Sequence, residues 1–441
     1  MSASHRDAGL VRGMGQWGLA ANLVSTIVGA GIFAVPGALA ACIGPWAPLA
    51  FVVCGIAIAS IAVCLAEGGS RLPTSGGIYG YIDAAFGPCA GYISGTLLWL
   101  SDVLACGGIA AALADASVSL LPASLKAPAH AAVIVAVIAA IATLNIGGVK
   151  RGSRLVNVAT IIKLLPLAVF LIAGAWAFHT ANFAPQPMQH ARDGLGRALI
   201  LALFTLTGME GALSASGEVA NPSRSIPRAL AIAIGSVALL YIAIQITAQG
   251  ILGPALAHST VPLADAMARI SPALRALMLA GAAISMLGWI TGDILATPRM
   301  LFAFGRDGLY PRILGHTHPR THAPHIAIIC YAAIAAILAL TGTFAELAVL
   351  ATLASAVLYI GGCLAAWRLA RNGVARAGAP LNFRWLPAAM VVGIASMIAL
   401  IALASRAEII GLLAVTSGSA VLYLAQTRLR PAKNSAETPA L

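Results

Sequence analysis

Long apolar runs separated by short polar connections make up the chain from end to end. A helix needs roughly 20 apolar residues to cross the hydrocarbon core of a bilayer, and about twelve runs reach that length. The pattern therefore predicts an all-α integral membrane protein with about 12 transmembrane helices. The predicted spans are 17–43, 45–67, 88–114, 130–148, 155–178, 195–216, 227–250, 274–300, 324–342, 345–367, 385–404 and 408–427.

Composition supports this prediction and accounts for the charge. Of the 441 residues, 60% are hydrophobic and only 9% are charged, with a mean hydropathy of +0.93, outside the range of a soluble domain. If the N-terminus lies in the cytoplasm, 19 of the 26 Lys and Arg fall on cytoplasmic connections, as the positive-inside rule expects. The net charge of +12 is therefore dispersed, and no basic patch predicts a nucleic-acid partner.

The expected location is a cell membrane, with both termini cytoplasmic. The apolar run after the polar residues 1–16 is too long for a removable signal peptide, so we expect the N-terminus to be retained. The frequent use of Ala, Gly and Arg is typical of a bacterial inner membrane protein.

Two apolar segments depart from an unbroken helix at corresponding places. They are STIVGAGIFAVPG, residues 25–37, and FTLTGMEGALSASGE, residues 204–218. A break frees N–H and C=O groups that hydrocarbon cannot satisfy, so it is tolerated where it lines a polar cavity. Matching breaks in two halves are typical of an inverted-repeat transporter. Glycines for close helix packing are the alternative interpretation.

This pattern predicts the organisation of the chain. We expect an inverted repeat of spans 1–5 and 6–10, with broken helices 1 and 6 and two peripheral helices after the repeat. The predicted segments are a cytoplasmic tail (1–16), transmembrane repeat 1 (17–178), transmembrane repeat 2 (195–371), spans 11–12 (385–427) and a second cytoplasmic tail (428–441).

Five blocks in order resemble the amino acid, polyamine and organocation transporters, a family with a five-plus-five inverted-repeat fold. They are IVGAGIFAVPG, RLPTSGGIYGYIDAAFGP, LNIGGVKRGSRLVNVATIIKLLPL, FTLTGMEGALSASGEVANPSRSIPRA and TPRMLFAFGRDGLYP. The resemblance covers about residues 15–371. It implies a secondary active amino acid transporter that works by alternating access, by exchange or proton coupling. The sequence leaves open whether the protein is a monomer or homodimer. A non-transporting amino acid sensor and a channel are the alternatives.

The two breaks offer complementary partners for an amino acid. Amides around Ala30, Gly31 and Ile32 lie at the start of the outer half-helix, where free N–H groups and the positive dipole end favour a carboxylate. Carbonyls in both breaks can accept from the ammonium group. By resemblance, Phe204 stands where relatives often have tryptophan, and is either an aromatic gate or a packing residue. The candidate substrate-binding residues are Thr26, Ile27, Ala30, Gly31, Ile32, Ser101, Asp102, Phe204, Thr205, Thr207, Gly208 and Asp293.

Four ionisable residues lie well inside predicted spans, and the cost of a charge in lipid requires them to face the interior. Lys163 resembles a substitute for the sodium ion of sodium-coupled members of this fold, or is paired with Asp293 or another acid. Either arrangement predicts sodium-independent transport. Glu210 either exchanges a proton in step with substrate or is a hydrogen-bonded strut. Asp102 and Asp293 suit a cationic amino acid or polyamine if both face the pocket, and small or apolar amino acids otherwise.

The remaining patterns indicate no catalysis. The sequence contains no GxxxxGK[ST], GxSxG or HExxH motif, so we expect no enzyme activity and no cofactor. The seven cysteines form no CxxC pair, and the histidine-rich loop GHTHPRTHAPH lacks supporting acids, so no metal site is predicted. By resemblance, an inner gate is expected at the cytoplasmic helix ends, where topogenic charges are the alternative. Its candidate residues are Glu218, Arg224, Arg299, Arg306 and Asp307.

Overall fold

The computed structural model describes residues 14–429, apart from residues 30, 73–75, 120, 148–161, 185–190, 214–218, 307, 322 and 377. Within these residues the chain is helical and has no β-strand; an isolated bridge joins Met14 and Val219. The longer helices are α2 (Gln16–Ile27), α3 (Gly31–Ile43), α4 (Ala47–Arg71), α5 (Gly77–Phe86), α6 (Pro88–Val118), α7 (Ala123–Ile146), α9 (Leu164–Trp176), α10 (Ala191–Leu206), α12 (Pro222–Leu252), α14 (Pro272–Ala296), α15 (Pro298–Arg306), α16 (His325–Thr341), α17 (Phe344–Arg371), α18 (Leu386–Ala402) and α19 (Arg406–Leu429).

Short helical segments complete the described structure. They are η1 (Gly44–Trp46), η2 (Thr180–Phe183), α11 (Met209–Leu213), η4 (Gly253–His258), α13 (Pro262–Ala268) and η5 (Arg312–Gly315).

Each of the twelve predicted spans contains a helix, and the all-α prediction is confirmed. Among the described residues, eight helical stretches are long and apolar enough to cross a membrane, and three further apolar helices are shorter. The count of twelve and the inverted repeat therefore stay predictions. The eight stretches are Gly31–Arg71, Pro88–Val118, Ala123–Ile146, Gly194–Leu213, Pro222–His258, Pro272–Arg306, Phe344–Arg371 and Arg406–Gln426.

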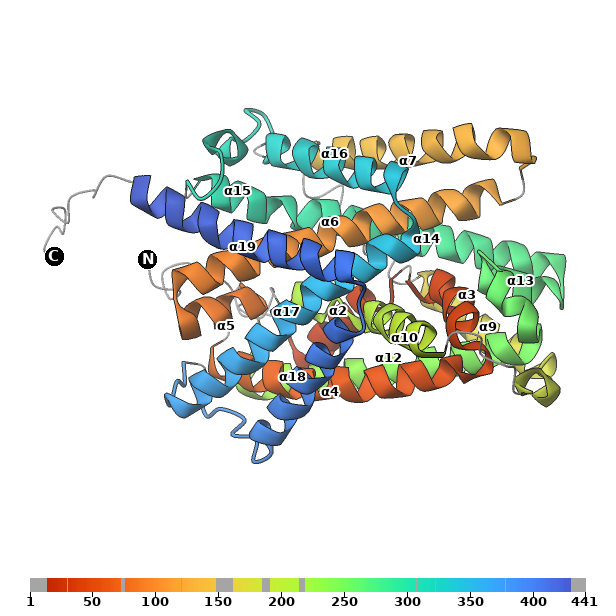
Figure 1. Ribbon diagram of the computed structural model, residues 1–441, viewed down its shortest axis with the longest axis horizontal. Helices are drawn as coiled ribbons and strands as arrows, with labels where there is room; N and C mark the ends of the chain where they lie inside the picture. Colours follow the sequence, from red (N-terminus) through yellow and green to blue (C-terminus); the bar gives the residue numbers. More distant parts are fainter. Residues whose placement is uncertain are drawn as a thin grey trace, which may run out of the picture.

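The long helices lie side by side along the long axis of the molecule (Figure 1). In that view α7, α16, α6 and α14 occupy the upper half, and α4, α12 and α18 the lower half. The shorter α2, α3 and α10 lie between these groups, where α2 packs on α12 and α10 packs on α3. The centre of the bundle is therefore built from the two glycine-rich segments.

Both glycine-rich segments are interrupted helices. In the first segment, α2 ends at Ile27 and α3 begins at Gly31. In the second, α10 ends at Leu206 and α11 begins at Met209. The two interruptions are in direct contact, because a Cβ built at Gly208 would lie 3.1 Å from the carbonyl oxygen of Thr26. The expected breaks are therefore present, and they face each other.

One helix was not anticipated from the hydrophobic pattern. Residues 77–86 form α5, which packs on α6 and α17, although they fall between two predicted spans. The segment is bracketed by Gly76 and by Gly87, whose φ is +89°, and it is too short to read as a span. Glycine-rich flanks and a length of 10 residues hid it from a search for long apolar runs.

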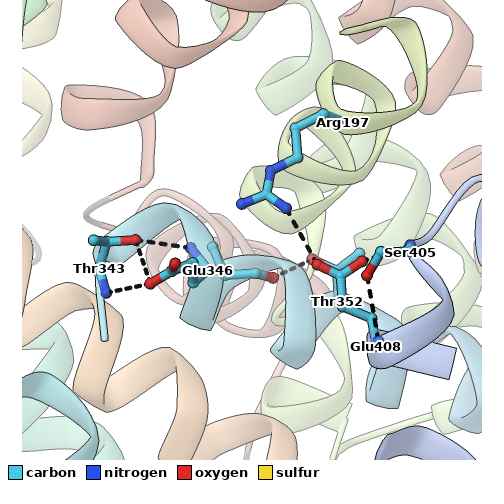
Figure 2. Close-up of polar contacts among 7 residues, drawn as sticks. Arg197, Thr343, Glu346, Thr352, Ser405 and Glu408 are labelled. Carbon is cyan, nitrogen blue, oxygen red and sulfur yellow. Dashed lines mark hydrogen bonds and ion pairs between the residues drawn. The ribbon is translucent and has the colours of Figure 1, made fainter. Parts of the chain in front are cut away.

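Polar caps fix the starts of two helices near one end of α10 (Figure 2). Thr343 and Glu346 form a reciprocal capping box at the start of α17. Ser405 and Glu408 exchange equivalent bonds at the start of α19, at 2.8 and 3.3 Å. Glu408 also forms a 3.2 Å ion pair with Arg197 of α10. The peripheral α19 is thereby attached to the helix that leads into the second break.

Candidate functional site

A cavity of about 300 Å³ lies beside the two helix interruptions. It is the point at which the four ionisable residues from the predicted spans come together. Its lining includes Asp102 of α6, Lys163 just before α9, Glu210 of α11, Asp293 of α14, Thr26 of α2 and Gly208. A smaller cavity of about 50 Å³ adjoins it and is lined by Ile27, Gly31, Ser101, Phe204, Thr205 and Thr207. The two cavities share Thr26, Asp102, Gly208, Glu210 and Trp289.

Side chains from other helices hold the free carbonyls of the first break. The hydroxyl of Tyr241 on α12 donates to the Ile27 carbonyl at 3.0 Å. The hydroxyl of Ser285 on α14 donates to the Gly29 carbonyl at 3.3 Å. These bonds satisfy backbone acceptors that the interruption leaves without helical partners, as the interior of a membrane protein requires.

Lys163 holds a third carbonyl in the same region. Its ammonium nitrogen donates to the backbone oxygen of Ser25 and lies 3.2 Å from the Ser25 hydroxyl. The residue is buried, with 5% of its surface exposed. Among the residues that the structure describes, it forms no ion pair with Asp293 or any other acid. The positive charge is therefore placed against the last turn of α2, next to the break.

Glu210 holds the second break. Its Oε2 atom accepts from the Gly208 amide at 3.0 Å and from the Tyr359 hydroxyl of α17 at 2.6 Å. Because Glu210 also lines both cavities, a carboxylate that anchors the backbone is at the same time exposed to the site. The same position is therefore compatible with a hydrogen-bonded strut and with a carboxyl that exchanges a proton in step with substrate.

Gly208 adopts a backbone conformation that a larger residue resists, with φ at +112°. Gly208→Ala should therefore lower the uptake rate about fivefold, since strain of about 1 kcal/mol would fall on the break. Gly411→Ala on α19 is the control, because Gly411 lines neither cavity and a Cβ there would meet no atom within 4 Å. Uptake by the two variants in proteoliposomes tests this. Equal rates would show that the backbone conformation of Gly208 is not needed for transport.

Asp102 and Asp293 share one hydroxyl group. The Thr297 hydroxyl lies 2.9 Å from Asp102 Oδ2 and 3.1 Å from Asp293 Oδ1, and Tyr331 donates to Asp293 Oδ2 at 2.6 Å. A hydroxyl has a single hydrogen to donate. Asp293 has the Tyr331 hydroxyl as a second donor, but the Thr297 hydrogen can serve only one of the two half-buried acids at a time. Two carboxylates this close favour a bound proton or a cationic group between them.

Trp289 of α14 is a site residue that the sequence did not single out. Its indole lines both cavities, and a Cβ built at Gly29 would lie 2.9 Å from the ring. The ring thus packs on the first break at Gly29, and Phe204 packs on it at Gly31. Only its place in an apolar run was visible in the sequence, and that place does not distinguish a site tryptophan from a packing one.

The other candidate residues divide into three groups. Ser101 lines the smaller cavity and donates to the Ala351 carbonyl at 3.0 Å, whereas Ile32 is buried and lines neither cavity. Arg224 and Arg306 are exposed and Arg299 is half-buried, and the described part of the chain shows no ion pair for Arg224 or Arg299. Ala30, Glu218 and Asp307 lie outside the described residues.

Comparison with known proteins decides the family. The amino acid permease family model matches residues 14–425, which is nearly all of the chain. The chain belongs to the amino acid permease family. It is therefore a multi-pass membrane transporter that carries a small-molecule substrate, and the resemblance seen in the sequence is confirmed.

Curated relatives match the permease over most of its length. A methylthioribose transporter of Bacillus subtilis (strain 168) is 29% identical over 80% of this chain and 81% of its own. The serine/threonine exchanger SteT of the same organism is 26% identical over 88% of this chain and 90% of its own. An uncharacterized transporter of Mycobacterium tuberculosis is 30% identical over 72% of this chain and 71% of its own. The two Bacillus subtilis relatives differ in the substrate that they are named for, so the family alone does not define what this permease carries.

Proposed function

We propose that the permease is a secondary active, sodium-independent amino acid transporter of a bacterial inner membrane. It would work by alternating access through twelve spans that form two inverted five-span repeats. The observation that carries this proposal is the contact between two interrupted helices beside a cavity with buried ionisable groups. Backbone amides and carbonyls at such breaks suit the carboxylate and ammonium groups of an amino acid.

Counterflow in proteoliposomes tests the proposal. A carrier reorients with its substrate, so unlabelled amino acid inside the vesicles should accelerate entry of the labelled compound. A channel shows no such stimulation, and a sensor shows no entry. Exchange is supported further by the relative described as an exchanger.

Sodium independence follows from the position of Lys163. Its ammonium group already supplies a positive charge beside the first break, bonded to Ser25. Uptake should therefore be the same, to within about twofold, when choline replaces sodium on both sides of the membrane; twofold corresponds to about 0.4 kcal/mol. A requirement for a sodium gradient would contradict this prediction.

The role of Glu210 in coupling is tested by Glu210→Gln. The amide keeps one acceptor oxygen for the Gly208 amide but cannot take up a proton. If Glu210 couples transport to protons, the pH dependence of uptake should flatten in the variant. Tyr359→Phe is the control, since it removes the 2.6 Å bond but leaves a titratable carboxyl. A pH profile unchanged by Glu210→Gln would leave the residue as a strut.

A substrate with a second positive charge is the favoured alternative within this function. Both Asp102 and Asp293 line the larger cavity, and the described residues pair neither of them with Lys163. An arginine, lysine, ornithine or polyamine would bring a cationic group that two neighbouring carboxylates favour. Small neutral amino acids would need a bound proton at the same place.

A further inference from the structure

A third cavity, larger than the two beside the helix breaks, lies on the outside of the bundle between α4 and α12. Its volume is about 640 Å³ and its lining is almost wholly apolar. Val52 and Ile56 on one wall and Leu239 on the other are exposed, at 39%, 60% and 70% of their surface. In a membrane protein such walls face hydrocarbon, so the groove is open to lipid.

Glycines keep the groove open. Gly55 of α4 and Gly235 of α12 both line it, and a Cβ at Gly235 would have no atom within 4 Å. The two helices nevertheless pack closely along the rest of their length. The groove therefore exists because two lining positions are glycines without side chains, and not because the two helices are separated.

One end of the groove is closed by a fastened loop. Leu381 and Phe383 line this end. The Leu381 amide donates to the Ser70 hydroxyl at 3.1 Å, and the Phe383 amide donates to Glu67 Oε2 at 3.0 Å. Glu67 is itself held by a buried 2.7 Å ion pair with Arg71. Because the loop is hydrogen-bonded to the last turn of α4, it closes this end of the groove at a fixed position.

The closed end carries exposed positive charge. Arg384 follows Phe383 directly, and Arg228 follows the lining residue Pro227 and lies one helical turn before the lining residue Ala231. Both arginines are exposed. Guanidinium groups bind phosphate oxygens with paired hydrogen bonds. An apolar groove with two such groups next to its lining residues at one end matches a molecule with an apolar tail and an anionic phosphate head.

We propose that this groove binds an anionic phospholipid, with an acyl chain between α4 and α12 and the phosphate beside Arg228 and Arg384. This site is separate from the transport site, and its occupation does not depend on the transported substrate. Gly55 and Gly235 provide room for the chain, and the fastened loop at 381–383 sets the position of the head group.

Native mass spectrometry of the full-length protein tests the proposal. The protein is incubated with equal amounts of phosphatidylglycerol and phosphatidylcholine of identical acyl chains. Wild type should retain one phosphatidylglycerol more than Gly235→Leu, which fills the groove. Gly411→Leu on α19 is the matched control, because a Cβ there also meets nothing within 4 Å, and it should retain the wild-type number. Arg228→Gln and Arg384→Gln should each lower the preference for phosphatidylglycerol about fivefold.

Photocrosslinking of the unmodified protein keeps the test independent of the variants. A phosphatidylglycerol with a photoreactive acyl chain should label peptides of α4 and α12 above other exposed helices. Equal retention by wild type and Gly235→Leu, equal retention of the two lipids, or labelling spread evenly over the surface would each overturn the proposal. Crosslinks between two copies through α4 and α12 would overturn it as well, since a second copy would then cover the groove.

Discussion

Lys163→Ala should lower the uptake rate of the reconstituted permease about a hundredfold. The lysine donates to the Ser25 carbonyl beside the first helix break and contacts the Ser25 hydroxyl at 3.2 Å. Alanine would leave a buried backbone acceptor without this donor and remove the positive charge from the site. A loss of about 2.7 kcal/mol, within the range for unsatisfied groups bonded to a charge, corresponds to that factor.

Lys126→Ala is the matched control for this variant. Lys126 is an exposed lysine on α7, so its removal changes the net charge equally without touching the break. Initial rates of labelled amino acid uptake at equal protein incorporation give the comparison. Full activity of Lys163→Ala would show that the ammonium group is not needed at the first break. The lysine would then give no reason to expect sodium-independent transport.

Asp102→Asn should weaken competition by arginine about thirtyfold while leaving competition by serine within about twofold. Two opposite charges about 4 Å apart attract by about 4 kcal/mol at an effective dielectric constant of 20. Half of that attraction, about 2 kcal/mol, corresponds to the roughly thirtyfold change expected for arginine. Asp102 lines both cavities and shares the Thr297 hydroxyl with Asp293. Asparagine keeps the shape of the side chain, so the expected loss reflects charge.

The control for this prediction lies on the same helix. Asp115 is about half-exposed near the end of α6 and pairs with His130 at 3.2 Å, outside both cavities. Asp115→Asn should leave the whole inhibition profile unchanged. Arginine that competes as weakly with wild type as with Asp102→Asn would favour a neutral substrate and a protonated acid pair.

Local chemistry made the helix breaks predictable. Glycines and polar residues in an apolar run cannot sit in an unbroken lipid-facing helix, and α2 indeed ends at Ile27 and α10 at Leu206. The number of crossings stays a prediction, because α9 and α16 lie in predicted spans but are 13 and 17 residues long, shorter than the roughly 20 residues that cross a bilayer. The helix α5 was not predicted, because a helix of 10 residues between glycines forms no long apolar run.

Partners across the bundle were not predictable from spacing. The sequence placed Asp102 and Asp293 inside spans, and the cost of a charge in lipid required them to face inward. That both would meet Thr297, and that Tyr331 would donate to Asp293, depends on how α6, α14 and α16 pack. The sequence offered Lys163 either as a substitute for a sodium ion or as the partner of Asp293 or another acid. Neither expectation named the Ser25 carbonyl, since backbone acceptors carry no residue signature.

The carbonyls of Ile27 and Gly29 are each held by a side chain from a different helix, and Lys163 holds that of Ser25. At the first break, one short stretch of backbone is therefore hydrogen-bonded to α12, to α14 and to the start of α9. If α2 tilts relative to any of them, a particular hydrogen bond must be exchanged for another. In the alternating-access cycle that we propose, the order of those exchanges would set the sequence in which the two sides open and close.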